Sequence, residues 1–319
     1  MSETSRREFF KAAGAAATGV LASTTASPAA IEPQTQRVST NADRFRDLVQ
    51  KREPFECISV FDVLSARMVQ LMGFRSVVAG GVPMAEFQGL PDWGLTTIDE
   101  RINFATHIAE NVELPTVADI DDPGDPLSVY RVVKKLERSG IVSMHFGDGN
   151  GVMGRVTSIT PANEMIDKIH AALDARSAGI LISIRCQSLM LEGMEKTVAR
   201  AAAYAEAGAE AIQFTPTPSF NDFPRISDTV KAALAAAFGA QESLSLAKQS
   251  RITVVRYMSL LDNIAQSAAY DALMEFKNTG MWAKSSRGQR LGSTIPADFR
   301  AKMLQTDEQT RRGNKHNVG

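Results

Sequence analysis

The sequence predicts an α/β protein built as a (β/α)8 TIM-like barrel. Short β-rich runs alternate with helix-length amphipathic stretches along most of the chain, which indicates a parallel sheet covered by helices. Seven or eight such units fit into a mature chain of about 280 residues, the usual size of this barrel. An open doubly wound sheet is the alternative, but no GxGxxG motif follows an early strand, which disfavours a dinucleotide-binding fold.

The predicted strands are apolar runs rich in β-branched residues, and the predicted helices lie between them. The strands are expected at 57–61, 76–80, 115–120, 142–146, 180–186, 211–215 and 252–257. The helices are expected at 64–73, 97–111, 126–138, 161–176, 193–207, 226–248 and 258–278. An eighth strand could lie at 232–240, but the sequence AALAAAFGA favours a helix. The seventh unit is therefore expected to be degenerate.

Helix boundaries in this pattern carry recognisable signals. Thr97-x-x-Glu100 is a capping box, and Thr160-Pro161 supplies a cap followed by a proline at the first helical position. Gly208 stands just beyond a helix and before the next strand. These signals agree with the alternation of helices and strands.

The N-terminus predicts an export leader. Ser5-Arg6-Arg7-x-Phe-Phe-Lys11 is followed by a weakly apolar, alanine-rich run, which resembles a twin-arginine signal. We expect a signal peptide at 1–30, a linker at 31–42, the barrel at 43–285 and a C-terminal tail at 286–319. The twin-arginine pattern predicts a periplasmic or secreted protein. The run is too short and alanine-rich for a stable membrane span. A disordered or amphipathic basic tail is the alternative.

Charge and cysteine content narrow the class of protein. The net charge is −1, without the basic bias of a nucleic-acid binder. Hydrophobic residues make up 44% of the chain, enough for a sizeable core. Cys57 and Cys186 both fall in predicted strands, and we expect two small buried residues rather than a disulfide.

Four aspartates gather at the end of one predicted strand, in VADIDDPGDP (117–126). Side chains alternate along a strand, so Asp119 and Asp121 should point to the same side at its C-terminal end. Two carboxylates about 7 Å apart repel by about 2.4 kcal/mol at an effective dielectric near 20, so either one takes up a proton or a cation lies between them. Mg²⁺ commonly uses one or two protein carboxylates. Asp122 and Asp125 suit turn and helix-capping roles, which is the structural alternative for the whole cluster.

Several motifs together resemble the isocitrate lyase/phosphoenolpyruvate mutase superfamily over about residues 55–280. They are FDVLSAR (61–67), GF (73–74), AGG (79–81), GLPDWGLTTIDE (89–100), ADID (118–121), EM…KIHAALDAR (164–176), EG (192–193) and AAAYAEAGAEAI (201–212). The resemblance implies an (α/β)8 barrel, a Mg²⁺-bound 2-oxo or 2-hydroxy carboxylate and an enolate-type intermediate. It also implies a homo-oligomer, dimer or tetramer, and residues 254–280 resemble the final strand and a last helix exchanged between neighbours.

The resemblance assigns roles to acidic residues. Asp119 and Asp121 match the metal-site aspartates of the family, and Asp92 matches the aspartate of its GLPD motif. Asp92 is accordingly a candidate catalytic residue, with Mg²⁺ as the expected cofactor.

The resemblance also assigns substrate-binding groups. Gly80 and Gly81 match the loop whose amides hold the substrate carboxylate, although Ala79 replaces the usual serine. Arg185 matches an arginine that steadies substrate charge, a catalytic and binding role that suits a guanidinium fork. A structural ion pair is the alternative for Arg185.

The chain departs from the family where protons are usually transferred. Gly147 replaces a metal-associated glutamate, and the loop at 150–160 is short and lacks the lysine-rich segment, cysteine and histidine. Cys186 and Gln187 replace Thr-Asp, and Thr215 replaces a glutamate. A positioned acid or base contributes about 10²–10⁴-fold, so these losses should remove most standard lyase activity.

A few other residues could contribute at the mouth. Arg256, with Tyr257, ends the last strand and offers a second substrate-binding anion clamp. His145 is either a core residue or a replacement for a lost group, and Asp148 and Arg155 either contact substrate or lie in a solvated turn. Two further histidines, His107 and His170, are expected to be structural.

The sequence is compatible with three functions. The first is an exported, diverged Mg-dependent lyase or decarboxylase that acts on a small carboxylate through an enolate, with oxaloacetate decarboxylation as one example. The alternatives are an inactive family member that binds a small carboxylate, and an oligomeric scaffold without a ligand. Paired aspartates at a barrel mouth favour the enzyme.

Overall fold

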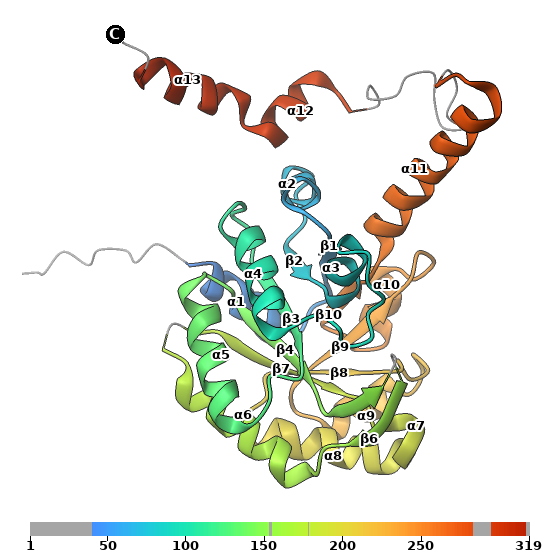
Figure 1. The fold of residues 1–319 in the computed structure, drawn as a ribbon. Helices are drawn as coiled ribbons and strands as arrows, with labels where there is room; N and C mark the ends of the chain where they lie inside the picture. The colour runs from blue at the N-terminus through green and yellow to red at the C-terminus, as the bar shows by residue number, and fades with distance from the viewer. Residues whose placement is uncertain (1–39, 153–154, 178, 283–294, 317–319) are drawn as a thin grey trace, which may run out of the picture. The chain divides into compact units, whose positions relative to one another are not determined.

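The computed structural model describes residues 40–152, 155–177, 179–282 and 295–316. Eight parallel strands of this part of the chain close into a barrel, which confirms the predicted fold (Figure 1). The order around the barrel is β1-β10-β9-β8-β7-β4-β3-β2. The strands are β1 (Phe55–Val60), β2 (Ser76–Ala79), β3 (Thr116–Asp121), β4 (Ser143–Gly147), β7 (Leu181–Cys186), β8 (Ala211–Phe214), β9 (Ala233–Phe238) and β10 (Val254–Tyr257).

Helices between the strands cover the outside of the barrel, whereas α1 precedes the first strand and α11, α12 and α13 follow the last one. They are α1 (Asn41–Gln50), α2 (Val63–Leu71), α3 (Gly81–Phe87), α4 (Ile98–Ala109), α5 (Pro126–Arg138), α6 (Ala162–Ala175), α7 (Leu189–Glu192), α8 (Met194–Glu206), α9 (Phe223–Thr229), α10 (Leu244–Gln249), α11 (Leu260–Thr279), α12 (Ala297–Leu304) and α13 (Thr306–His316). The predicted capping box is present, because the Thr97 hydroxyl accepts from the Glu100 amide. Asp125 caps α5 by accepting from the Ser128 amide at 2.7 Å.

The seventh unit is complete, so the prediction of a helix over 226–248 is wrong. β9 (Ala233–Phe238) pairs with β8 on one side and β10 on the other, between the short helices α9 and α10. Ala233 and Ala235 are fully buried and pack inside the barrel. Alanine has a high helix propensity, but here the tertiary requirement for small side chains inside the ring determines the structure.

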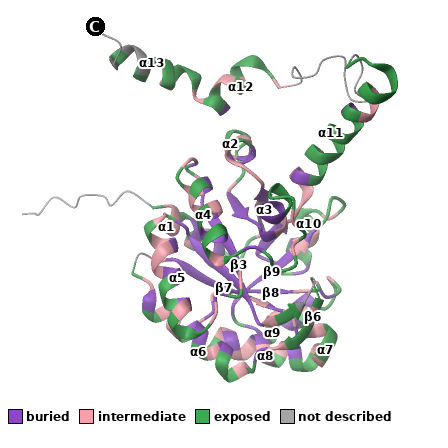
Figure 2. Cartoon of the chain, in the orientation of Figure 1, coloured by how far each residue is buried: buried purple, intermediate pink, exposed green. Residues whose placement is uncertain are grey.

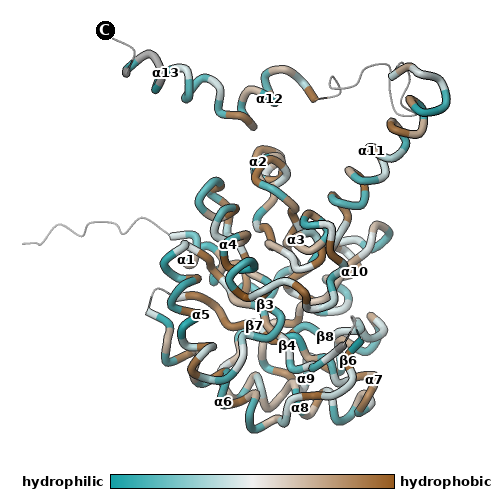
Figure 3. Tube along the Cα trace, in the orientation of Figure 1, coloured by the Kyte–Doolittle hydropathy of each residue, from teal (hydrophilic) through white to brown (hydrophobic). Residues whose placement is uncertain are grey.

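Two separate hydrophobic clusters form the core. The larger one lies between the strands and the helices. The smaller one fills the barrel interior near the N-terminal ends of the strands, around residues such as Phe55, Val117 and Leu181. Figure 2 shows the strands as buried, and Figure 3 shows that they are mostly hydrophobic, whereas the helices mix polar and apolar residues. Phe45 of α1 closes the interior by packing edge-on against Phe55, with ring centroids 5.7 Å apart. Helix α1 begins at Asn41, near the end of the predicted linker.

An antiparallel hairpin follows β4 where the sequence suggested only a shortened loop. Its strands are β5 (Gly149–Val152) and β6 (Arg155–Ile159). The hairpin stands at the C-terminal end of the barrel strands, the end that carries the active site in this fold.

The C-terminal helix α12 and the N-terminal leader were both parts of the chain whose structure the sequence left open. Helix α12 packs on α2, where Arg67 Nη1 donates to the carbonyl of Met303 at 3.1 Å. Within the described residues, no helix combines the length and apolarity that crossing a membrane requires. The predicted leader at 1–30 and most of the linker lie outside the described residues.

Candidate active site

Asp119 and Asp121 stand at the C-terminal end of β3, as expected, but the backbone between them is irregular. The pairing of β3 with β4 shifts register between these residues, and Asp121 has a φ of 61°. A non-glycine residue in this left-handed region costs about 1 kcal/mol or more, and such strain gathers at functional sites. Simple alternation therefore does not describe this strand end, yet both carboxylates still meet at one side chain.

That side chain is Arg185, which reaches across from β7. Its Nη1 lies 3.3 Å from Asp119 Oδ1, and its Nη2 donates to Asp121 Oδ1. Burial alone would raise the pKa of Asp121, but the charges of Arg185 and Arg101 outweigh it and hold the pKa below its usual value. The pKa of Arg185 is raised, since the neighbouring aspartates outweigh its burial.

Arg101 completes this ion-pair network, although it belongs to none of the motifs that predicted the site. It lies in the first turn of α4 with only 2% of its side chain exposed. Its Nη2 contacts Asp121 Oδ2 at 2.5 Å and Asp92 Oδ1 at 3.3 Å. Burial and the charge of Asp121 raise the pKa of Asp92, and Arg101 offsets part of this effect. A single arginine in the first turn after the capping box was the only sequence signal for this role.

The Gly80–Gly81 segment lies directly beside this network. Gly80 caps α3, and Gly81 is its first residue. A Cβ on Gly81 would stand 2.5 Å from Arg101 Nη1, and a Cβ on Gly80 would stand 2.8 Å from Ser59 Oγ. Both positions therefore require glycine because of close neighbours.

A second polar layer lies deeper in the barrel. Arg256, on β10, donates to Gln213 Oε1 at 2.6 Å and to Ser183 Oγ at 3.2 Å. His145 Nδ1 lies 3.0 Å from the same Ser183 hydroxyl, and the ring is 2% exposed. Burial, together with Arg256 and Arg185, holds the pKa of His145 well below its usual value. The imidazole is thus a neutral interior group and not a solvent-facing acid.

Several buried donors in these two layers have no hydrogen-bond partner among the described residues. They are Arg101 Nη1, Arg185 Nε, Arg256 Nε and the hydroxyl of Ser59. An unsatisfied buried donor costs about 1–3 kcal/mol, and more when it is charged. Donors of this type are suited to the oxygens of a carboxylate ligand.

The predicted magnesium site does not fit this arrangement. Both oxygens of Asp121 face guanidinium groups, and Asp119 faces Arg185. The described residues contain no group of three or more His, Cys, Asp or Glu side chains placed to hold a metal. A divalent ion at these carboxylates would also meet the positive charges of the guanidinium groups that already contact their oxygens. Asp92, Asp119 and Asp121 are instead paired with Arg101 and Arg185.

The position of the lost family glutamate is filled by another side chain. A Cβ on Gly147 would stand 2.2 Å from Gln187 Oε1, which also accepts from the amide of Gly149 at 3.2 Å. The two departures from the family pattern at Gly147 and Gln187 are therefore complementary. Together they anchor the start of the β5–β6 hairpin.

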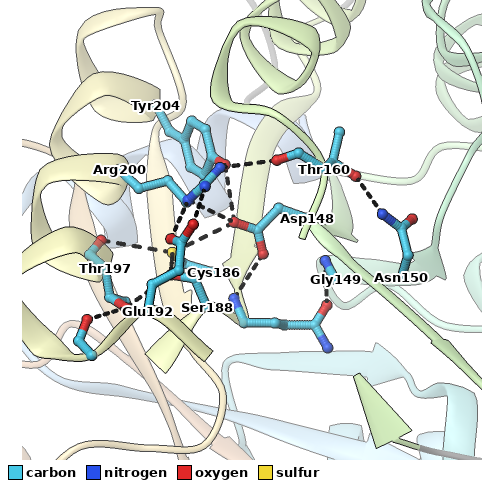
Figure 4. Close-up of polar contacts among 12 residues, drawn as sticks. Asp148, Gly149, Asn150, Thr160, Cys186, Ser188, Glu192, Thr197, Arg200 and Tyr204 are labelled. Carbon is cyan, nitrogen blue, oxygen red and sulfur yellow. Dashed lines mark hydrogen bonds and ion pairs between the residues drawn. The ribbon is translucent and has the colours of Figure 1, made fainter. Parts of the chain in front are cut away.

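Asp148 does not lie in a solvated turn, so that interpretation was wrong. Figure 4 shows its carboxylate enclosed by Tyr204, Arg200 and Cys186. The Tyr204 hydroxyl donates to Asp148 Oδ2 at 2.9 Å, and the Gln187 amide donates to Oδ1 at 2.7 Å. The side chain is fully buried, and burial raises its pKa despite these hydrogen bonds. This network fixes Asp148, the residue that directly precedes the β5–β6 hairpin.

The remaining candidates lie away from the ion-pair network. Arg155 is exposed on β6, and the Tyr257 hydroxyl donates to the carbonyl of Glu242. His107 and His170 lie in α4 and α6, as expected for structural residues. Thr215, at the position of a family glutamate, begins the segment after β8.

Comparisons with known proteins agree with this fold and motif set. The family model described as phosphoenolpyruvate phosphomutase matches residues 45–278. The chain is 32% identical to oxaloacetate decarboxylase of Pseudomonas putida (strain GB-1) over 60% of its own length and 68% of the relative. It is also 32% identical to 2-methylisocitrate lyase of Aeropyrum pernix, over 60% of its own length, and spans 63% of that relative.

A solved structure gives the same result for the fold. Phosphonopyruvate hydrolase in complex with oxalate and Mg++ superposes with a TM-score of 0.75 at 20% identity, covering 88% of this chain and all of that one. The relatives named above support a carbon–carbon lyase. The chain belongs to the phosphoenolpyruvate phosphomutase family, within the isocitrate lyase/phosphoenolpyruvate mutase superfamily that its motifs predicted.

Proposed function

We propose that this lyase acts on a small 2-oxo or 2-hydroxy carboxylate, with oxaloacetate as the leading candidate. The observation that supports it best is a set of three arginines, Arg101 and Arg185 at the barrel mouth and Arg256 in the layer below them, each with a buried N–H that lacks a partner among the described residues. These donors suit a substrate with a carboxylate and a neighbouring carbonyl oxygen. The names of the relatives agree with such a substrate.

The chemistry follows from charge stabilisation. In oxaloacetate the bond between the CH₂ carbon and the leaving carboxylate breaks, its electron pair forms an enolate with the neighbouring ketone, and CO₂ departs. The same carbon of the enolate then takes a proton from water, which gives pyruvate. Fixed positive groups aimed at the developing oxyanion stabilise it without reorganisation, an effect of about 3–4 kcal/mol for one donor. Arg185 is the best placed, since its Nε is unpaired and its other nitrogens are fixed by Asp119 and Asp121.

Magnesium dependence was part of the sequence prediction, and the solved relative with Mg++ and oxalate is consistent with it. For this chain, the positions of Arg101 and Arg185 argue against it. The proposed reaction therefore draws its positive charge from guanidinium groups.

The test uses the purified full-length chain with oxaloacetate and, separately, oxalate. Pyruvate formation above the uncatalysed rate, lost in Arg185→Met but retained in the remote variant Arg251→Met, supports the enzyme. Arg251 is a suitable control because its ion pair with Asp228 is exposed. Calorimetric oxalate binding without turnover of any 2-oxo acid indicates the inactive binding protein. If neither ligand binds, the assignment of a carboxylate site fails.

Export is a further part of the proposal, and it rests on Arg6 and Arg7, which lie outside the described residues. Replacing both with lysine should leave the chain with its leader attached in the cytoplasmic fraction, whereas the unaltered chain is processed. Equal processing of both forms in fractionated cells would refute the twin-arginine assignment.

A homo-oligomer is also proposed. Helix α11 exposes apolar side chains, including Ile264, Tyr270, Leu273 and Phe276, as a helix shared with a second copy would. Light scattering should give a mass of two or more chains, and Leu273→Asp should lower it. A monomeric mass for the unaltered chain would refute this part.

A further inference from the structure

We infer that Arg101 is the resident cation of this site, occupying by its guanidinium the place that the sequence assigned to a divalent metal. The ligand of Arg101, a small carboxylate, is taken from the proposed function. The exclusion of a metal depends only on the geometry of the ion pairs. The guanidinium contacts both Asp92 and Asp121 through Nη2. It thereby joins two carboxylates that would otherwise repel each other.

The position of Arg101 is built into the fold. Helix α4 begins at a full capping box on Thr97, which fixes the turn that carries Arg101. The side chain is 2% exposed, and the space beside it exists only because residue 81 lacks a Cβ. A metal could enter only by displacing this buried guanidinium from the two carboxylates that it already pairs with.

One nitrogen of Arg101 remains available for a ligand. Nη1 has no hydrogen-bond partner among the described residues and lies against Gly81, at the start of α3. The same guanidinium can therefore hold the aspartates with one nitrogen and donate to a substrate carboxylate with the other. A divalent ion bridges carboxylates and substrate in the same manner, and arginine offers the geometry to replace it.

The direct test is metal binding by the full-length chain, with Mn²⁺ as the probe and electron paramagnetic resonance of free Mn²⁺ as the readout. The unaltered chain and Arg101→Lys, which keeps the charge, should show equally weak binding. Arg101→Met, which removes the charge but keeps much of the volume, should bind Mn²⁺ at least tenfold more tightly. Asp121→Asn in the Arg101→Met background should abolish the gain.

Two results would overturn the inference. Stoichiometric Mn²⁺ binding by the unaltered chain would show that Arg101 does not occupy the cation position. Equally weak binding by Arg101→Met, with its fold verified by circular dichroism, would show that Arg101 is not what excludes the metal.

A second measurement needs no variant, which matters if Arg101→Met does not fold. Oxalate affinity of the unaltered chain should be the same in excess EDTA and in Mg²⁺, within twofold. A tenfold or greater loss in EDTA would overturn the inference while leaving the carboxylate site intact. Failure of oxalate to bind in either condition would count against the proposed function, and the Mn²⁺ titration of the unaltered chain would still decide the role of Arg101.

Discussion

Gly81 and Arg101 are matched: a Cβ on residue 81 would stand 2.5 Å from Arg101 Nη1. We expect Gly81→Ala to push this guanidinium away from Asp121 and to weaken oxalate binding about tenfold, the loss of one charge-assisted hydrogen bond. Isothermal calorimetry provides the measurement. Gly239→Ala is the control, because Gly239 also has an ordinary φ and meets only the end of Glu242. Unchanged affinity in Gly81→Ala would contradict the match.

Asp121 has a positive φ, so a substitution that tests its charge must also tolerate this backbone conformation. Asparagine tolerates a positive φ far better than alanine, so Asp121→Asn should keep a melting temperature closer to that of the unaltered chain than Asp121→Ala does. Both variants should lose the ion pairs with Arg101 and Arg185. The difference in unfolding free energy between them, about 1 kcal/mol, is measurable by urea denaturation. Equal stability would mean that the left-handed conformation carries no strain.

Asp148 should give a distinctive pH dependence. Its folded-state pKa lies above the unfolded value, so its contribution to stability is greatest at low pH and decreases as pH rises from about 4 through the raised pKa. Asp148→Asn removes this titration and leaves all other groups unchanged. The unfolding free energy of the unaltered chain minus that of the variant should therefore fall as the pH rises above about 4 in urea titrations. A constant difference would indicate that the pKa is not raised.

His145 should not titrate in the usual range. Its ring is buried between Ser183 and two arginines, which disfavour the charged form. The imidazole signals of His145 in NMR spectra should stay constant from pH 8 to pH 5. A midpoint near 6.5 would place a solvent-accessible acid at the site and restore His145 as a candidate proton donor.

The departures from the family pattern at Gly147 and Gln187 should depend on each other, because the two positions share the same space. Gly147→Glu should destabilise the protein by about 1–3 kcal/mol, because the new side chain meets Gln187 Oε1. Gln187→Ala in the same chain should recover part of this loss, giving a non-additive double-mutant cycle in thermal unfolding. Additive effects would show that the two positions do not share space.

The sequence predicted the barrel well because strand and helix signals depend on local patterns. Seven strands and most helix starts follow from β-branched runs and caps such as Thr97. Alanine-rich β9 was misread, since only the closed ring shows that small residues are needed there. Local propensity contains no information about that packing requirement.

The candidate site was predictable only in part. The aspartates of β3 and Arg185 converge as the motifs suggested, although their roles remain predictions. Arg101 was missed because a single arginine on an amphipathic helix carries no sign of what it will face across the fold. Asp148 was misjudged for the same reason, because its burial depends on Tyr204, which lies far along the chain.

The two thiols lie in different cores, Cys57 inside the ring and Cys186 between the strands and the helices. Neither can reach the other, so no covalent link between them is required for the native fold. Maturation therefore needs no oxidant, and the chain can complete its folding in a reducing or an oxidising compartment alike.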